Sequence, residues 1–309
     1  MERIADLLVF VHIEKAAGTT LVHILRKNFL FRCVYMRPLY SRDTGETRWN
    51  PTVSDDDLRL ARRLFPGLRC IAGHAIGGAA FRDYGPAVRP ITILRDPIER
   101  FVSQFLYSRE ARGREWTMEE FLDIEELHNF QVKKIAGKDD VQLAKETLDR
   151  FWLVGTTDDF DKFLVLLRAK AGPQFDINYR AQNKRVGGRQ AGELLATYGD
   201  RIKERNLGDL ELYNYVTREL VPRYEASYGG DLNRDVAEFQ ESNRANAIAS
   251  WRGLADYAFR KVYVDRVLAA VRARNGLRPS GYYAEPRQKP RRGSWRDRAV
   301  AGWKRKSAR

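Results

Sequence analysis

The sequence predicts an α/β fold in which a central parallel sheet is flanked by helices and followed by a helical C-terminal extension. Short apolar runs alternate with segments of helical periodicity, a pattern typical of strands and helices wound into one parallel sheet. The 309 residues, 43% of them hydrophobic, suffice for one large α/β domain with an appendage. We divide the chain into a domain over residues 1–230, a helical extension over 231–278, and a basic linker and tail over 279–309.

Four short apolar runs are predicted to form the strands. Leu7–Ile13 is a continuous apolar run rich in β-branched and aromatic residues, the character of a parallel strand buried on both faces. The other three predicted strands are Arg69–Ala72, Pro90–Leu94 and Phe151–Gly155. Helices are expected at Leu21–Phe29, Phe160–Leu167, Leu207–Tyr228 and Leu254–Arg274. Asn233–Trp251 is polar and has only weak periodicity.

The loop between the first strand and the first helix carries the chemistry of an anion site. Lys15 supplies a full positive charge, and Thr19 and Thr20 add hydroxyl donors. The small residues Ala17 and Gly18 let the backbone curl around an anion, and the helix start adds N–H groups and a partial positive charge. These features predict a P-loop-like phosphate site, although an ordinary strand-to-helix turn with a threonine cap would look similar.

This loop differs from the Walker A pattern G-x-x-x-x-G-K-[ST]. In that pattern the lysine follows the second glycine at the helix start, whereas here Lys15 precedes Gly18 on the strand side. Coordination of Mg²⁺ is therefore not implied, and no metal is expected. A P-loop nucleotide phosphotransferase nevertheless remains an alternative, as does a basic protein that binds membranes or nucleic acid without catalysis.

A second anion site is predicted where the third strand ends. Arg95 leaves this strand end, where ligands of parallel sheets gather, and Ser103 lies two turns along the next helix. Asp96, Pro97 and Glu99 predict a capping box at the start of this helix. An arginine fork and a hydroxyl can together clamp a phosphate. The alternative is that Arg95 pairs with a neighbouring acid and Ser103 is solvated.

Both segments resemble the carbohydrate sulfotransferases related to heparan sulfate 2-O-sulfotransferase. His12–Leu21 (HIEKAAGTTL) is similar to the 5′-phosphosulfate loop of that family, although Glu14 stands where proline is usual. Ile93–Ser103 (ILRDPIERFVS) resembles the family element that binds a 3′-phosphate. The likeness extends over about residues 6–228. Three further similar segments are Asn129–Gly137, Leu153–Asp161 and Leu207–Tyr213.

The resemblance implies transfer of a sulfuryl group from 3′-phosphoadenosine-5′-phosphosulfate (PAPS) to a hydroxyl. It assigns the loop residues Lys15, Ala17, Gly18, Thr19 and Thr20, together with Arg95 and Ser103, to the donor. Lys15 would also stabilise the leaving group. The acceptor is expected to be a glycan, a glycolipid or a small natural product.

The general base implied by the resemblance is His74, which follows a predicted strand and lies 21 residues before Arg95. Glu14, beside the loop, is the second candidate for the base. His12 is expected to be a packing residue held by a hydrogen bond in the first strand. His23 is expected at the surface or at an interface, and His128 in a structural role.

Charge and cysteine content predict the surroundings of the protein. The net charge is +14, and residues 285–309 contain ten Lys or Arg against two acids. Trp295 and Trp303 would share one face of a helix, so residues 287–309 either contact an anionic membrane peripherally or form a solubilising tail. Specific nucleic-acid binding is not expected.

Cys33 and Cys70 are predicted to be reduced core thiols, and the expected location is the cytoplasm. Peripheral contact at the inner membrane surface is a further hypothesis.

Overall fold

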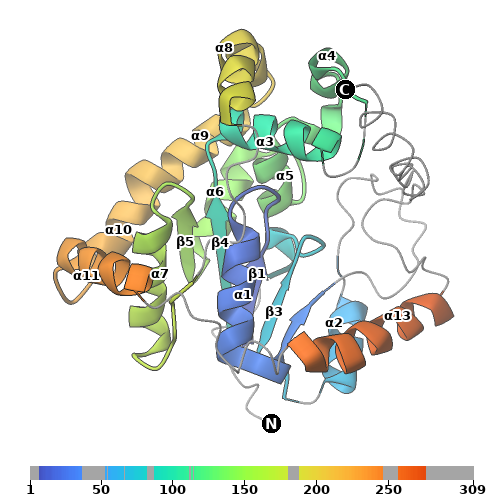
Figure 1. Ribbon diagram of the computed structural model, residues 1–309, viewed down its shortest axis with the longest axis vertical. Coiled ribbons are helices and arrows are strands. Elements are labelled where there is room, and N and C mark those ends of the chain that lie inside the picture. The colour runs from blue at the N-terminus through green and yellow to red at the C-terminus, as the bar shows by residue number, and fades with distance from the viewer. Residues whose placement is uncertain are drawn as a thin grey trace, which may run out of the picture.

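In the computed structural model, five parallel strands form one sheet in the order β2-β3-β1-β4-β5. The central strand β1 pairs with β3 on one side and with β4 on the other, and Val11 lies opposite both Gly73 and Thr92. Helices flank the sheet (Figure 1), which confirms the predicted α/β fold. The strands are Leu7–Val11 (β1), Cys33–Tyr35 (β2), Cys70–Gly73 (β3), Val88–Leu94 (β4) and Leu153–Thr156 (β5).

The described residues are 7–36, 53, 55–65, 67–81, 87–110, 113, 115–179, 188–245 and 257–275. The basic linker and tail over 279–309, with the hypothesis of membrane contact through 287–309, lie outside these residues.

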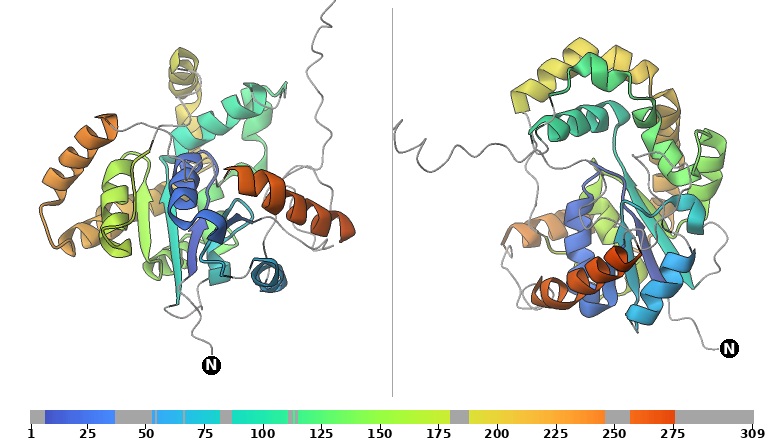
Figure 2. Two further views of the ribbon diagram at one scale, coloured as in Figure 1. Left: turned by 60° about the horizontal axis from the view of Figure 1, so that its bottom comes forward. Right: turned by 90° about the vertical axis from the view of Figure 1, so that its right-hand side faces the viewer.

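Alternate residues of the strands belong to two separate hydrophobic cores, one on each face of the sheet. Leu8 and Phe10 of β1 face one core, and Leu7, Val9 and Val11 face the other. Both faces are covered, so β1 is apolar throughout, as predicted for a buried parallel strand. Figure 2 shows α1 and α2 on opposite sides of the sheet.

The first core lies against α1, α7 and α11, which are Gly18–Phe29, Phe160–Ala171 and Leu232–Ala245. The second core lies against a larger set of helices. These are Asp55–Leu64 (α2), Pro97–Glu110 (α3), Met118–Leu122 (α4), Phe130–Ala136 (α5), Val141–Asp149 (α6), Gly188–Glu204 (α8), Leu207–Tyr215 (α9), Val221–Ala226 (α10) and Asp265–Arg274 (α13). Two π-helical segments, Val216–Leu220 (η4) and Arg260–Val264 (η5), join α9 to α10 and precede α13. Short 3₁₀ helices occur at Leu30–Arg32, Gly78–Phe81 and Glu125–Leu127.

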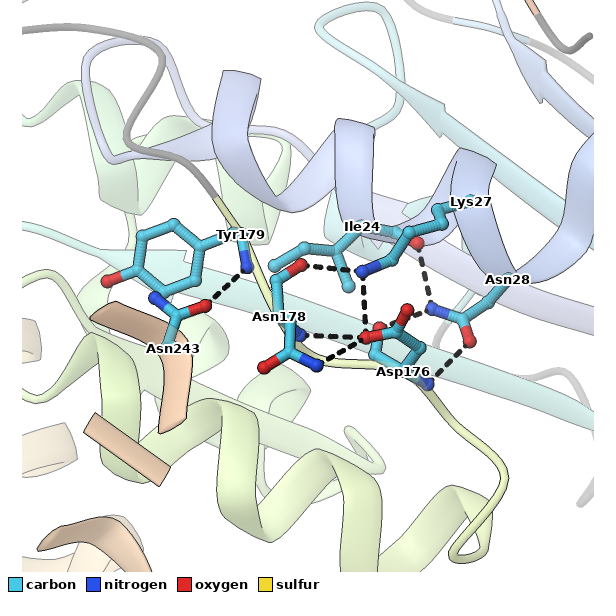
Figure 3. A network of polar contacts seen from close by, with 7 residues as sticks. All are labelled: Ile24, Lys27, Asn28, Asp176, Asn178, Tyr179 and Asn243. Atoms are coloured by element: carbon cyan, nitrogen blue, oxygen red, sulfur yellow. Dashed lines mark hydrogen bonds and ion pairs between the residues drawn. The ribbon is translucent and has the colours of Figure 1, made fainter. Parts of the chain in front are cut away.

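The segment that follows α7 is fastened to α1 by a polar network (Figure 3). Lys27 near the end of α1 binds the Asp176 carboxylate at 2.8 Å and the Asn178 carbonyl at 2.6 Å. Asn28 exchanges two hydrogen bonds of 2.8 Å with the backbone of Asp176. The Tyr179 amide then donates to Asn243 of α11 at 2.8 Å. These contacts hold α1, which starts at the predicted phosphate loop, against two other helices of the same face.

Most predicted elements are present, with shifts of up to four residues at their ends. β1 ends at Val11, two residues earlier than predicted, because the chain then turns into the loop. The predicted helix Leu207–Tyr228 is realised as α9, η4 and α10 in succession. The elements that the sequence analysis does not predict are β2, α2, α4, α5, α6, α8, α11 and the short 3₁₀ helices.

Cys33 and Cys70 face each other across β2 and β3 as buried, free thiols, as predicted. Their sulfur atoms are 3.1 Å apart. Burial raises the pKa of Cys70 well above its ordinary value.

Candidate functional site

The predicted site residues follow three adjacent strands at the carboxyl edge of the sheet. His12 and the loop to Gly18 follow β1, His74 follows β3, and Arg95 follows β4. Because β3 and β4 flank β1, these residues meet around one loop although they are far apart in the sequence. Figure 1 shows this loop at the upper end of the sheet, below α3.

The loop after β1 turns through two left-handed residues. Lys15 has a φ of 67° and Ala17 a φ of 55°, values that are uncommon for residues with a Cβ. Ala17 directly precedes α1, and its carbonyl accepts hydrogen bonds from the amides of Thr20 at 3.1 Å and Leu21 at 3.4 Å. Tight loops at a helix N-terminus form concavities that suit anions. Ala17 and Thr19 are exposed at this turn, and Lys15 and Thr20 are half-buried.

Gly18 lies directly against the imidazole of His12. A Cβ at Gly18 would stand 1.9 Å from both Cδ2 and Nε2 of His12, so no larger residue fits without displacing the ring. Nδ1 of His12 lies 3.0 Å from the Tyr35 hydroxyl. Burial lowers the pKa of His12 well below its ordinary value, and the nearby His74 and Lys134 add to this shift. His12 is therefore a neutral packing residue held by a hydrogen bond, as predicted.

Lys15 and Arg95 meet between the loop and α3, and Ser103 belongs to the helix face that they contact. Nη1 of Arg95 donates to the carbonyl of Lys15 at 3.3 Å, and the Lys15 ammonium lies 4.2 Å from the centre of the Tyr107 ring. Glu99, Ser103 and Tyr107 are spaced four residues apart and line one face of α3. The outer two of this row contact Arg95 and Lys15, so the half-buried Ser103 between them faces the same region.

The alternative in which Arg95 pairs with a neighbouring acid is also realised. Nη2 of Arg95 lies 2.8 Å from the Glu99 carboxylate. Asp96 caps α3 as predicted, because its carboxylate accepts from the amides of Ile98 at 3.0 Å and Glu99 at 2.9 Å. The Glu99 carboxylate thus contacts Arg95 instead of completing the capping box. An anion that binds Arg95 must share the guanidinium with Glu99 or displace it.

The backbone of Arg95 is clamped by Gln131, to which the sequence analysis gives no role. The Gln131 amide accepts from the Arg95 N–H at 3.0 Å and donates to the Arg95 carbonyl at 2.9 Å. The Asp209 carboxylate in turn accepts from the amides of Gln131 at 3.0 Å and Val132 at 2.8 Å, and so caps α5. Asp209 is fully buried, and burial raises its pKa. In the sequence, these two residues are marked only by their segments, Asn129–Gly137 and Leu207–Tyr213, which resemble segments of the sulfotransferase family.

His74 is held at the end of β3 by contacts on one side of its ring. Nδ1 lies 3.0 Å from the carbonyl of His12, and because a carbonyl can only accept, Nδ1 carries the proton. In the neutral ring Nε2 then carries the lone pair that a general base needs. The Glu14 carboxylate lies 3.4 Å from the same Nδ1, and buried Lys134 donates from Nζ to the backbone carbonyl of His74.

The remaining two histidines lie elsewhere in the fold. His23 is exposed on α1, as predicted for a surface residue. Nε2 of His128 donates to the carbonyl of Leu122 at 2.7 Å, which matches the predicted structural role.

No protein-family model and no curated protein matches this chain. Within the described ranges, no group of three or more His, Cys, Asp or Glu is arranged to hold a metal ion. No helix in this part of the chain is long and apolar enough to cross a membrane. The inference of function therefore depends on the residues around the loop after β1.

Proposed function

We propose that this protein is a sulfotransferase that transfers a sulfuryl group from PAPS to a hydroxyl acceptor. The observation that supports this most directly is the meeting of Lys15 and Arg95 at a tight loop before α1, against the face of α3 that carries Ser103. PAPS carries two separate anionic groups, the 5′-phosphosulfate and the 3′-phosphate. A cationic loop and a nearby arginine with a hydroxyl provide one site for each group.

In this proposal the loop binds the 5′ end of the donor. Thr19, Thr20 and the backbone amides at the start of α1 donate to the phosphosulfate, and Lys15 neutralises charge that develops on the leaving phosphate. Arg95 and Ser103 bind the 3′-phosphate. The exposed or half-buried state of these side chains leaves them accessible to a ligand.

His74 is the general base of the proposed reaction. The acceptor hydroxyl gives its proton to Nε2 of His74 as its oxygen attacks the sulfur atom. The bond between sulfur and the bridging phosphate oxygen breaks, and its electron pair stays with adenosine 3′,5′-bisphosphate (PAP). The hydrogen bond from Nδ1 to the carbonyl of His12 supports this role because it leaves the lone pair on Nε2.

A P-loop nucleotide phosphotransferase is the second candidate, since the sheet and the loop position are compatible with it. The start of α1 favours the sulfotransferase. Helix α1 begins at Gly18 and continues with Thr19 and Thr20, whereas the lysine lies three residues before the helix. In the Walker A arrangement the lysine stands within the helix start.

The acceptor in this proposal is a glycan, a glycolipid or a small natural product. We further propose that the enzyme works in the cytoplasm and that residues 287–309 contact anionic membrane peripherally. Such contact would bring the site near a lipid-linked acceptor.

Calorimetry with PAP and with ATP tests the donor site. PAP should bind much more tightly than ATP, and Arg95→Ala should weaken PAP binding several-fold to hundreds-fold, because a charge-assisted hydrogen bond contributes about 1.5–3 kcal/mol. Arg109→Ala is the matched control, since Arg109 is an exposed arginine at the other end of α3. Equal PAP affinity in the Arg95 variant and the wild type would remove Arg95 from the site.

Transfer itself is tested by incubating the protein with sulfur-labelled PAPS and an extract of the source cells. The expected result is a labelled product that resists removal of free sulfate and whose formation requires intact protein. Tight ATP binding together with phosphate transfer in place of sulfuryl transfer would favour the phosphotransferase.

A further inference from the structure

Glu14 is a buried carboxylate in the middle of the predicted anion loop. Its exposed fraction is 8%, and neither carboxylate oxygen accepts a hydrogen bond from the described part of the chain. A buried carboxylate without hydrogen-bond donors is costly unless a nearby positive charge compensates for it. Two described groups that can supply such a charge are His74 and Lys134.

One of these two groups is the imidazole of His74, whose Nδ1 lies 3.4 Å from Oε1 of Glu14. The same Nδ1 donates to the carbonyl of His12 at 3.0 Å, so the ring already has its orientation from the backbone. The carboxylate therefore adds negative charge beside a ring that a hydrogen bond has fixed. Its effect is small while the ring is neutral and large once the ring gains a proton.

We propose that Glu14 is a positioning residue that acts through His74, holding the ring and stabilising the imidazolium formed when His74 takes a proton. This inference deepens the proposed function and rests on it. The proton passes from the acceptor hydroxyl to Nε2, and the resulting positive charge on the ring faces the Glu14 carboxylate. In this proposal the base is His74, and Glu14 takes no proton from the acceptor.

Lys134 completes the arrangement from α5. It is buried, and burial lowers its pKa while the Glu14 carboxylate opposes that shift. Its ammonium donates to the backbone carbonyl of His74, so it holds the end of β3 and not the ring. Lys134 thereby compensates part of the Glu14 charge before the reaction.

In the described part of the chain, charged and titratable groups approach His74 from at least four places in the fold. His12 at the end of β1 stacks near it with ring centres 3.9 Å apart, and Tyr35 at the end of β2 lies 5.8 Å away. Glu14 approaches from the loop and Lys134 from α5. His12 has a strongly lowered pKa and stays neutral, and of these four groups Glu14 is the acidic one.

The first test follows the His74 imidazole by NMR as the pH is changed, without any substrate. In Glu14→Gln the midpoint of the His74 titration should move to lower pH, because an opposite charge is lost beside the protonated ring. Glu125→Gln removes an exposed carboxylate at a distant 3₁₀ turn and should leave the midpoint in place. An unchanged midpoint in Glu14→Gln would overturn the inference.

The second test uses turnover with sulfur-labelled PAPS and the cell extract. Glu14→Gln should lower turnover about 10-fold to 100-fold, as expected for loss of one opposite charge, with PAP affinity unchanged. The acidic limb of its pH profile should move to lower pH. His74→Ala should lose about 10²–10⁴-fold. Adding Glu14→Gln to the His74 variant should then have little further effect, because Glu14 acts through that ring.

The outcomes separate this inference from the proposed function. If Glu14→Gln shifts the His74 titration but the wild type transfers no label, the interaction between Glu14 and His74 is supported and the sulfotransferase proposal is rejected. If labelled transfer depends on His74 but not on Glu14, the sulfotransferase proposal is supported and the role of Glu14 is rejected. A large further loss in the double variant would make Glu14 the base instead. If Glu14→Gln does not fold, Glu14→Asp should give the same shifts at smaller size.

Discussion

At the scale of single residues, the absence of a side chain at Gly18 fixes the geometry of the loop. The sequence suggests that a small residue is needed there so that the backbone can curl around an anion. The structure gives a further reason, because the His12 ring occupies the space that a Cβ would need. His12 is in turn the residue whose carbonyl holds His74. Gly18 therefore supports both the loop and the proposed base.

Gly18→Ala should destabilise the protein by about 1–3 kcal/mol, the usual cost of overpacking a dense interior. The measurement is the free energy of unfolding in urea. Gly192→Ala is a matched control, because that glycine lies inside α8 and nothing lies within 4 Å of an added Cβ. The control should be neutral or stabilise the protein by up to about 1 kcal/mol. Equal stability of the two variants would contradict the contact with His12.

At the scale of elements, the position of Arg95 depends on two helices that are remote in sequence. Gln131 at the start of α5 clamps the Arg95 backbone, and Asp209 of α9 caps α5. The N-terminal amides of a helix need such acceptors, and here they find one in another helix. The segments around residues 95, 131 and 209 thus form one supporting unit for the predicted 3′-phosphate site.

Asp209→Asn should lower the free energy of unfolding by about 3–5 kcal/mol, because it removes the carboxylate that attracts buried Arg100 and leaves one α5 amide facing an amide group. PAP affinity should also fall as Gln131 and Arg95 shift. Asp200→Asn, at an exposed aspartate of α8, is the control and should change stability by less than about 0.5 kcal/mol. Near-native stability of the Asp209 variant would show that the cap is not needed.

Three of the elements that the sequence analysis misses, β2, α8 and α11, carry little sequence signal. β2 has only three residues, too few for a strand pattern to be recognised. α8 and α11 are exposed over most of their surface, and Ile202 is the one fully buried residue of α8, so few apolar residues indicate these helices in the sequence. Such helices are stabilised mainly by packing on neighbours such as α3 and α7, which the sequence does not reveal.

At the scale of the whole molecule, the concentration of basic residues in 285–309 predicts binding to anionic membranes. Each basic residue near an anionic leaflet contributes about 1 kcal/mol of attraction, weakened by salt. The full chain should therefore float with anionic vesicles at low salt, whereas a chain cut after Gln288 should stay in the soluble fraction. Neutral vesicles are the control. If the full and the shortened chain both stay soluble with anionic vesicles, residues 287–309 are a solubilising tail and not a membrane contact.

The sequence by itself determined the class of fold and the position of the loop, Lys15, His74 and Arg95 at strand ends. These features depend on local patterns: apolar runs, helix starts, and a polar residue directly after a strand. Only the tertiary structure decided which of these residues touch. The strand order places β3 and β4 on either side of β1, and this brings His74 to Glu14 and Arg95 to Lys15. Such contacts join residues 60 to 80 positions apart, and they form only when the whole sheet has been assembled.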